Sequence, residues 1–211
     1  MRRHQRCLQV FAREPHEGRV KTRLIPVIGA VAATAVYRRL LARTLQAAKQ
    51  ADADRVEIWL DREPESPTFA IALTERGFSL HVQPPLDLGR RMSSAIGDGL
   101  GRADRVVLIG SDCPSLTPGY LDRAFTALER HDVVIGPTHD GGYILVGMCH
   151  AEPTLFDGIR WSTPQVLAQT RDRLRRLALD WAELPTQRDI DQATDLDLFP
   201  ELLDGLVRGS D

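Results

Sequence analysis

The stretch VVLIGSDCP, residues 106–114, decides the fold. Its first four residues form a short apolar run, which is typical of a strand buried on both faces of a parallel sheet. Asp112 follows just past the carboxyl end of that strand, where open α/β sheets bind their ligands. A carboxylate there, with Pro114 stiffening the turn, is suited to hold a divalent cation against a phosphate. A helix-capping role for Asp112 is the weaker interpretation, because Thr117 and Pro118 already supply a cap and a first-turn proline.

Strand and helix patterns alternate along the chain and predict the α/β class. We expect a three-layer α/β/α sandwich around a mainly parallel mixed sheet, with short antiparallel additions near residues 142–147 and 181–184. Ser162 or Thr163 is the expected cap of one helix, and Thr194 the expected cap of the last. The predicted strands are 7–12, 56–60, 80–83, 106–109, 133–135 and 142–147, and the predicted helices are 30–51, 68–76, 88–100, 118–131, 164–177 and one in the tail.

The composition fits one compact domain over residues 1–211, with residues 1–6 as a flexible arm. The longest apolar runs fall far short of the roughly 18 residues that span a bilayer, and the apolar stretch after the basic start is too short for a secretory signal. We therefore expect a cytoplasmic protein without a membrane span. Cys7, Cys113 and Cys149 stand singly, so their spacing indicates neither a disulfide framework nor a zinc cluster.

Charge is distributed unevenly along the chain. Residues 1–50 hold eleven Lys/Arg against two Glu, whereas residues 180–211 hold nine acids against two Arg. One end suits phosphates and the other suits a metal ion. Aromatic residues make up 6% of the chain and are not interleaved with the basic ones, which argues against a nucleic-acid partner.

The loop after the first predicted strand, residues 13–24, is the expected phosphate site. It places Arg13, Arg19, Lys21 and Arg23 around the flexible Gly18. Guanidinium groups bind phosphate through two parallel hydrogen bonds, and an ammonium adds a compact charge. The loop does not match GxxxxGK[ST], and no GxGxxG follows a predicted strand, so P-loop and dinucleotide-oxidoreductase classes are excluded.

The acidic tail supplies candidate partners for Asp112. Mg²⁺ is usually held by one or two carboxylates together with substrate phosphates. Asp189 and Asp191 have no simple structural explanation, whereas Asp195 fits the first turn of the last helix. We expect only one of Asp189 and Asp191 to face the ion.

Three further segments are candidate parts of the site. Asp140 precedes Gly141, Gly142 and Tyr143, an arrangement that predicts a hairpin turn and a ligand contact equally well. Trp161 is expected either to stack on a sugar or base or to pack in the core. Ser162 and Thr163 are candidate phosphate donors. Gly89 and Arg90 are candidate nucleotide contacts, although a plain capped helix with solvated arginines is the safer interpretation of that pair.

These motifs together resemble one bacterial family with a glycosyltransferase-A-like fold, the nucleotide-diphospho-sugar transferases often labelled arsenosugar-biosynthesis-type glycosyltransferases. The resemblance runs from residue 7 to about residue 198 and also extends to 2-phospho-L-lactate guanylyltransferase and the molybdenum-cofactor guanylyltransferases. It implies that Arg13, Lys21 and Arg23 bind the donor's phosphates, that Asp112 holds Mg²⁺ or Mn²⁺, and that Asp189 or Asp191 completes the metal site. Gln192 departs from the Thr that is common at its position.

The leading hypothesis is a metal-dependent glycosyltransferase with a nucleotide-diphospho-sugar donor and a small-molecule acceptor. Lys21 and the cation would neutralise the leaving group, and Asp140 is the candidate base. The alternative is nucleotidyl transfer, in which a phosphorylated small molecule attacks an NTP and pyrophosphate leaves. A third class is a nucleotide-binding module without catalysis, which three candidate metal carboxylates make less attractive.

Overall fold

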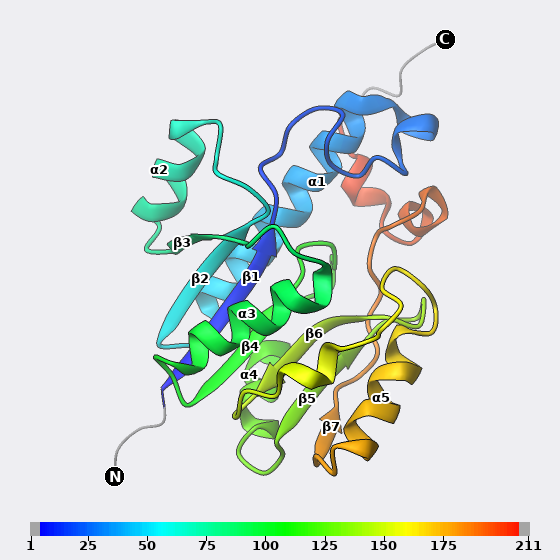
Figure 1. Cartoon of the computed structure of the whole chain (residues 1–211). Coiled ribbons are helices and arrows are strands. Elements are labelled where there is room, and N and C mark those ends of the chain that lie inside the picture. The colour runs from blue at the N-terminus through cyan, green and yellow to red at the C-terminus, as the bar shows by residue number, and fades with distance from the viewer. Residues whose placement is uncertain (1–4, 207–211) are drawn as a thin grey trace.

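The computed structural model describes residues 5–206, which form a seven-stranded sheet between helices (Figure 1). Residues 1–4 of the predicted flexible arm lie outside the described residues. Arg6 begins the first strand, so the predicted arm extends too far. The strands are β1 (Arg6–Ala12), β2 (Arg55–Leu60), β3 (Ser79–Val82), β4 (Arg105–Ile109), β5 (Val133–Pro137), β6 (Tyr143–Met148) and β7 (Trp181–Glu183). The α-helices are α1 (Ile25–Gln50), α2 (Pro67–Glu75), α3 (Leu88–Leu100), α4 (Pro118–Ala127) and α5 (Val166–Arg176), and the 3₁₀ helices are η1 (Pro153–Phe156), η2 (Ala193–Leu198) and η3 (Pro200–Leu203).

The sheet has the order β3-β2-β1-β4-β6-β5-β7, with β6 antiparallel to its neighbours β4 and β5. The expected antiparallel addition near residues 142–147 is therefore confirmed. The one expected near 181–184 is wrong, because β7 pairs parallel to β5. Helix α5 returns the chain to the end where β5 begins, and the amide of Asp132 donates to the carbonyl of Asp180 there at 3.0 Å.

Two hydrophobic clusters cover the two faces of the sheet and confirm the three-layer sandwich. Side chains of α1, α2 and α4 pack on one face around Leu8, Val10 and Ile109. Side chains of α3, α5 and η1 pack on the other around Val106 and Leu108. Neighbouring residues of β4 thus enter opposite clusters, as the two-residue period of a strand requires.

The topology fixes where a ligand can bind. After β1 the chain adds β2 and β3 on one side, and it then returns through α3 to place β4 on the other side of β1. The strand order reverses between the carboxyl ends of β1 and β4, which is the point where open α/β sheets form a crevice. The tail passes this crevice, and η3 lies beside α1 (Figure 1).

Helix α1 begins earlier than predicted because it continues across a kink at Gly29, which has φ of +77°. By length and composition α1 is apolar enough to cross a membrane. In this fold it packs instead: Tyr37 and Leu41 face the sheet cluster, and Val36 and Leu40 face a third cluster formed with the tail.

The ends of other helices test the predicted caps. Thr117 caps α4 through the amide of Tyr120, as expected. Neither Ser162 nor Thr163 caps α5, which follows Gln165 without a side-chain cap. The predicted last helix is a pair of 3₁₀ helices, and the capping residue is Gln192 rather than Thr194, with Asp195 accepting from the Gln192 amide at 2.7 Å.

Candidate active site

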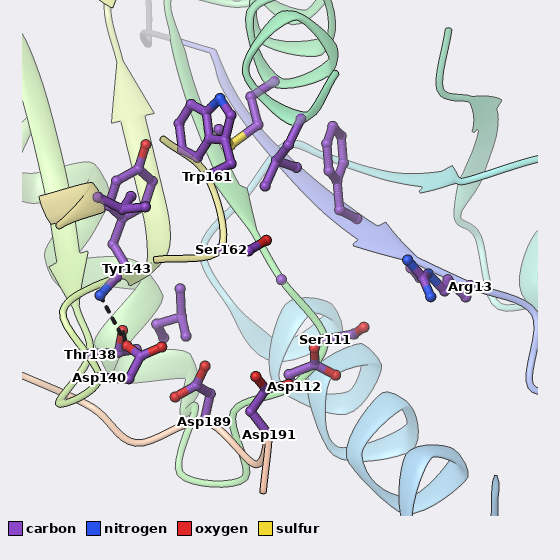
Figure 2. Close-up of a pocket in the computed structure, with 18 of the residues that line it drawn as sticks. Arg13, Ser111, Asp112, Thr138, Asp140, Tyr143, Trp161, Ser162, Asp189 and Asp191 are labelled. Carbon is purple, nitrogen blue, oxygen red and sulfur yellow. Dashed lines mark hydrogen bonds between the residues drawn. The ribbon is translucent and has the colours of Figure 1, made fainter. Parts of the chain in front are cut away.

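A cavity of about 850 Å³ opens at the carboxyl ends of β1 and β4. The loop after β1, the loop after β4, the β5–β6 turn, residues 161–164 and the tail meet there, and residues of α1, of α3 and of the ends of β2 and β3 complete the lining. Figure 2 shows carboxylates of three of these segments turned toward one another. The residues of the sequence prediction that line the cavity are Arg13, Lys21, Arg23, Asp112, Asp140, Gly142, Tyr143, Trp161, Ser162, Thr163, Asp189 and Asp191.

Lys21 is the centre of the polar contacts in this cavity. Its ammonium lies 2.8 Å from Oδ1 of Asp112 and donates to the carbonyl of Ile190, and only 5% of its side chain is exposed. The residue has a positive φ of 47°, an unusual conformation for a side chain other than glycine. Buried Val20 and Leu24 on either side anchor the loop in two hydrophobic clusters. The packing around Lys21 thus holds a strained turn that aims an ammonium at the cavity.

The tail is attached both to the loop after β4 and to the loop after β1. The amide of Ile190 donates to the carbonyl of Asp112 at 3.0 Å, and the side chain of Ile190 is fully buried. Arg23 forms an ion pair with Asp191 across the cavity mouth. The basic loop, Asp112 and the acidic tail, far apart in sequence, therefore share one site.

Both tail carboxylates line the cavity, so both stay candidate ligands, and the expectation that only one of them faces the ion stays a prediction. Asp189 and Asp191 are two residues apart, and in an extended segment such residues point to the same side. Ile190 between them points to the opposite side and packs against Leu24 and Leu196. The alternation of polar and apolar residues in this segment is the signal that predicts this orientation.

The donor set fits a hard divalent cation. Asp112, Asp140, Asp189 and Asp191 offer carboxylate oxygens to one cavity, and these are the ligands that Mg²⁺ and Mn²⁺ prefer. Within residues 5–206, no three of these carboxylates bring oxygens within 4.8 Å of one another. Lys21 and Arg23 neutralise two of them instead. A bound cation would thus compete with the basic loop for Asp112 and Asp191.

Asp189 shows how unfavourable the unbalanced charge is. Burial, together with the negative charge of Asp140, raises the pKa of Asp189 to about 6. A carboxyl group in the unfolded chain titrates near 3.9. A divalent ion would relieve this repulsion, so the raised pKa supports the assignment of a cation to the cavity.

The pKa of Asp189 gives a pH-dependent prediction. Between about pH 4 and pH 6 the folded protein keeps a proton on Asp189 that the unfolded chain has lost, so stability falls as pH rises through this window. Asp189→Asn removes the effect. In metal-free buffer the variant is expected to be more stable than the parent at pH 7 by about 1–3 kcal/mol and equal to it at pH 4. Urea denaturation across this range measures the difference, with exposed Asp172→Asn as control, and a pH-independent difference would contradict the prediction.

Asp140 belongs both to the turn and to the cavity, as the two open interpretations allowed. Its Oδ1 accepts hydrogen bonds from the amide of Gly142 at 3.0 Å and from the hydroxyl of Thr138. These bonds fix the carboxylate at the end of β5 and leave Oδ2 for a ligand. The carbonyl of Gly142 closes the turn by accepting from the amide of Thr138 at 3.0 Å.

Gly141 was a predicted binding residue, but it does not line the cavity. Its φ is +89°, and a Cβ built on it would lie 2.2 Å from the carbonyl oxygen of Pro164. The glycine thus permits close contact between the turn and residues 161–164. Gly141→Ala is expected to lower the free energy of unfolding by about 3 kcal/mol, from backbone strain and overpacking. Gly142→Ala, whose Cβ would meet only side-chain atoms at 3.3 Å or beyond, is the matched control in thermal denaturation. Equal losses in the two variants would contradict the explanation.

Trp161 both packs in the core and reaches the cavity. Its ring meets Tyr143 edge-on at 6.3 Å and Phe156 at 6.4 Å. Gly89, another predicted contact, does not line the cavity; a Cβ there would lie 2.8 Å from the indole nitrogen, so Gly89 lets α3 approach Trp161. Ser162, with φ of +62°, points toward the space between Trp161 and Asp112 (Figure 2).

Gly18 and Arg90 also lie off the cavity lining. Gly18 is an exposed turn residue with φ of +76°. Arg90 pairs with Asp87, the residue that caps α3, at 3.5 Å, so the plain capped-helix interpretation holds. Arg91 takes its place in the cavity, donating to Gln83 at 2.9 Å. The helical spacing from Leu88, which also lines the cavity, is the signal that would have identified Arg91.

Sequence reasoning missed Tyr37 and Ser111. The hydroxyl of Tyr37 accepts from the amide of Arg13 at 2.8 Å and lies 3.2 Å from Oγ of Ser111. It therefore ties the loop after β1 to the loop after β4. Burial raises the pKa of Tyr37 to about 12, so the group remains a neutral positioning residue. Burial also raises the pKa of Cys113, which disfavours the thiolate that a nucleophile needs.

Comparisons with known proteins identify a family and several solved structures that this chain resembles. A family model described as "Uncharacterized protein conserved in bacteria (DUF2064)" matches residues 44–163. A crystal structure from Desulfovibrio desulfuricans G20, provisionally described as a nucleotide-diphospho-sugar transferase, matches with 31% identity and a TM-score of 0.86, over 97% of this chain and 90% of that one. A search of curated proteins gives no match.

Two more distant structures share the fold alone. The CMP:2-keto-3-deoxy-manno-octonic acid synthetase complexed with CTP is 13% identical, with a TM-score of 0.54 over 94% of this chain and 98% of that one. Rv0371c of Mycobacterium tuberculosis H37Rv, complexed with manganese, is 18% identical, with a TM-score of 0.56 over 95% of this chain and 98% of that one.

Proposed function

The chain belongs to the DUF2064 family, and we propose that it is a metal-dependent glycosyltransferase that uses a nucleotide-diphospho-sugar donor. One observation carries the proposal: Lys21 of the basic loop and Asp112 of the carboxylate cluster form an ion pair in the same cavity. Phosphates and a cation then have adjoining sites. A cavity of about 850 Å³ is also large enough for a nucleotide sugar.

The roles of the residues follow from their positions. Lys21, Arg13 and Arg23 bind the donor's diphosphate, and Ser162 and Thr163 line the opposite wall. Asp112, Asp189 and Asp191 would hold Mg²⁺ or Mn²⁺, which supplies positive charge for the leaving diphosphate. Gln83 and Arg91, which also line the cavity, offer hydrogen bonds to a nucleobase.

The transfer step needs a group that accepts a proton. An acceptor hydroxyl oxygen bonds to the anomeric carbon while the bond from that carbon to the diphosphate oxygen breaks, and the hydroxyl proton passes to Asp140. The hydrogen bonds from Gly142 and Thr138 hold the Asp140 carboxylate in place for this role. Lys21 and the neighbouring arginines stabilise the charge that develops on the leaving group.

Nucleotidyl transfer is the second candidate, and the dense positive charge of the basic loop favours it because a triphosphate carries more charge than a diphosphate. In this reaction a phosphate oxygen of a small molecule bonds to the α-phosphorus of an NTP, and pyrophosphate leaves toward Lys21. The fold is compatible, since the CTP-bound synthetase shares it. Substrate and product chemistry distinguish the two reactions.

A thermal-shift screen tests the proposal. NTPs and UDP-, GDP- and dTDP-sugars are offered with Mg²⁺ or Mn²⁺ to the parent and to Asp112→Asn, with exposed Asp172→Asn as control. A donor bound at 100 times its dissociation constant stabilises the fold by about 2.7 kcal/mol. We expect a metal-dependent rise in melting temperature in the parent and in Asp172→Asn but not in Asp112→Asn. If no nucleotide raises the melting temperature, both candidate reactions are contradicted. Release of a free sugar or glycoside then supports glycosyl transfer, whereas pyrophosphate supports nucleotidyl transfer.

A further inference from the structure

A second cluster of metal-ligating side chains lies at the other end of the sheet. Ligand atoms of Asp132, Cys149 and His150 all lie within 4.8 Å of one another. Among residues 5–206, no other group of three such residues brings its ligand atoms this close together. None of these residues lines the cavity, and the proposed transfer reaction makes no use of them.

The sheet register brings these residues together. Asp132 directly precedes β5 and Cys149 directly follows β6, and the two strands pair so that Val133 lies opposite Met148. The amide of Cys149 donates to the carbonyl of Asp132 at 3.2 Å and extends the ladder by one step. Asp132 and Cys149 are thus held face to face by backbone hydrogen bonds.

Neighbouring groups orient one of the candidate ligands. The amide of Asp180 donates to Oδ2 of Asp132 at 3.0 Å. Asp180 also bonds to Nδ1 of His131 at 2.7 Å, so this second histidine is already engaged. Hydrogen bonds to a ligating carboxylate of this kind are typical of outer-shell groups at metal sites.

We propose that Asp132, Cys149 and His150 form a zinc site. Thiolate and imidazole are ligands that suit Zn²⁺, and neither is favoured by Mg²⁺. A carboxylate and a thiolate together balance the charge of the ion, and binding transfers the Cys149 thiol proton to solvent. Exposed His150 and half-buried Cys149 can close the remaining distance, since bonds of about 2.0–2.3 Å place ligand atoms closer together than 4.8 Å.

The consequence is a metal cross-link at the end of the sheet opposite the cavity. The ion would join the start of β5 to the end of β6, and the Asp180 contacts extend the link to the start of β7. The cation of the transfer reaction would be bound separately, by oxygen ligands at the opposite end. Failure of one site therefore leaves the other unaffected.

Native thiol labelling tests the site without using activity. Cys7 and Cys113 are 0% and 1% exposed, so a disulfide reagent of the Ellman type is expected to react with Cys149 in the chelator-treated protein. Equimolar Zn²⁺ is expected to slow this reaction at least tenfold, and Mg²⁺ is expected to leave it unchanged. Co²⁺ substitution should give a thiolate-to-cobalt charge-transfer band that is lost in Cys149→Ser.

His150→Ala separates a metal site from simple thiol binding. His150 is exposed, so the variant keeps the fold and the reactive thiol but is expected to lose at least nine-tenths of the zinc protection. His139→Ala, which removes an exposed histidine from the β5–β6 turn, is the matched control and keeps full protection. Equal protection in His150→Ala, no protection in the parent, or a cobalt spectrum without the thiolate band would overturn the proposal.

Discussion

Replacing Asp112 by asparagine is expected to lower transfer activity by about 10²–10³-fold and to remove the metal dependence of nucleotide binding. Asparagine keeps the shape of the side chain but supplies no negative charge for a cation. Asp112 also lies at the junction of the cavity, because its carboxylate faces Lys21 and its carbonyl accepts from Ile190. The substitution thus acts on the charge and spares the backbone contact.

The same change has a cost in stability. Lys21 is nearly buried, and without Asp112 its ammonium keeps the Ile190 carbonyl as a partner but loses its counter-charge. We expect the free energy of unfolding to fall by about 1–3 kcal/mol. Asp172→Asn on α5, a remote exposed carboxylate, serves as control. Product formation at saturating metal measures the loss of activity, and urea denaturation measures the loss of stability. A variant that kept both its activity and its metal dependence would refute the role assigned to Asp112.

Lys21→Met is expected to weaken donor binding by 10-fold to 100-fold and to destabilise the fold by about 1–3 kcal/mol. Methionine replaces the stem of lysine and omits the ammonium, so Asp112 and the Ile190 carbonyl both lose a bond. The tail then loses its contact with Lys21 of the loop after β1, whereas its hydrogen bond to the Asp112 carbonyl remains. Calorimetric titration with the nucleotide found in the screen measures the first effect and denaturation the second.

The sequence offers a matched control, because its only other lysine is Lys49. Lys49 lies near the end of α1, with its ammonium 6.0 Å from the centre of the Phe78 ring. Lys49→Met is expected to leave donor binding unchanged. If Lys49→Met weakened binding as much as Lys21→Met, a general effect of basic charge would replace the specific role.

The cavity gathers more acid groups than a folded core tolerates without compensation. Burial first, and the charge of Asp140 second, raise the pKa of Asp189, while Lys21 and Arg23 neutralise Asp112 and Asp191. Donor phosphates would engage the basic loop while a cation engages the carboxylates. Metal and donor are therefore expected to bind more tightly together than alone, which titrations of each in the presence of the other measure.

Local sequence patterns predicted the elements of the sheet because burial and periodicity act within a few residues. The apolar run before Asp112 gave β4, and Thr117 with Pro118 gave the start of α4. Predictions about where helices begin were less accurate. The predicted cap of α5 was wrong because that helix begins after Gln165 without a side-chain cap. The predicted cap of the last helix was wrong because Gln192 and Asp195, and not Thr194, cap the 3₁₀ helix that forms there.

Long-range contacts set what local patterns leave open. The direction of β7 depends on where α5 returns the chain, and nothing near residue 181 encodes it. Arg91 and Arg90 are adjacent arginines, and only the orientation of α3 against the sheet selects Arg91 for the cavity. Gly89 and Gly141 are required for close packing rather than for ligand contact, a distinction that needs the neighbouring atoms.

The sequence by itself determined the α/β class, the order of most strands and helices, and the residue types available for phosphate and cation binding, because periodicity, turn chemistry and charge are local properties of the chain. Only the tertiary structure decided that Lys21, Asp112 and Ile190 meet, that the tail carrying Asp189 and Asp191 lies at the cavity of Asp112, and that Asp132 and Cys149 stand opposite each other. The physical reason is that strand register and helix packing, which bring distant residues within bonding distance, depend on the whole core.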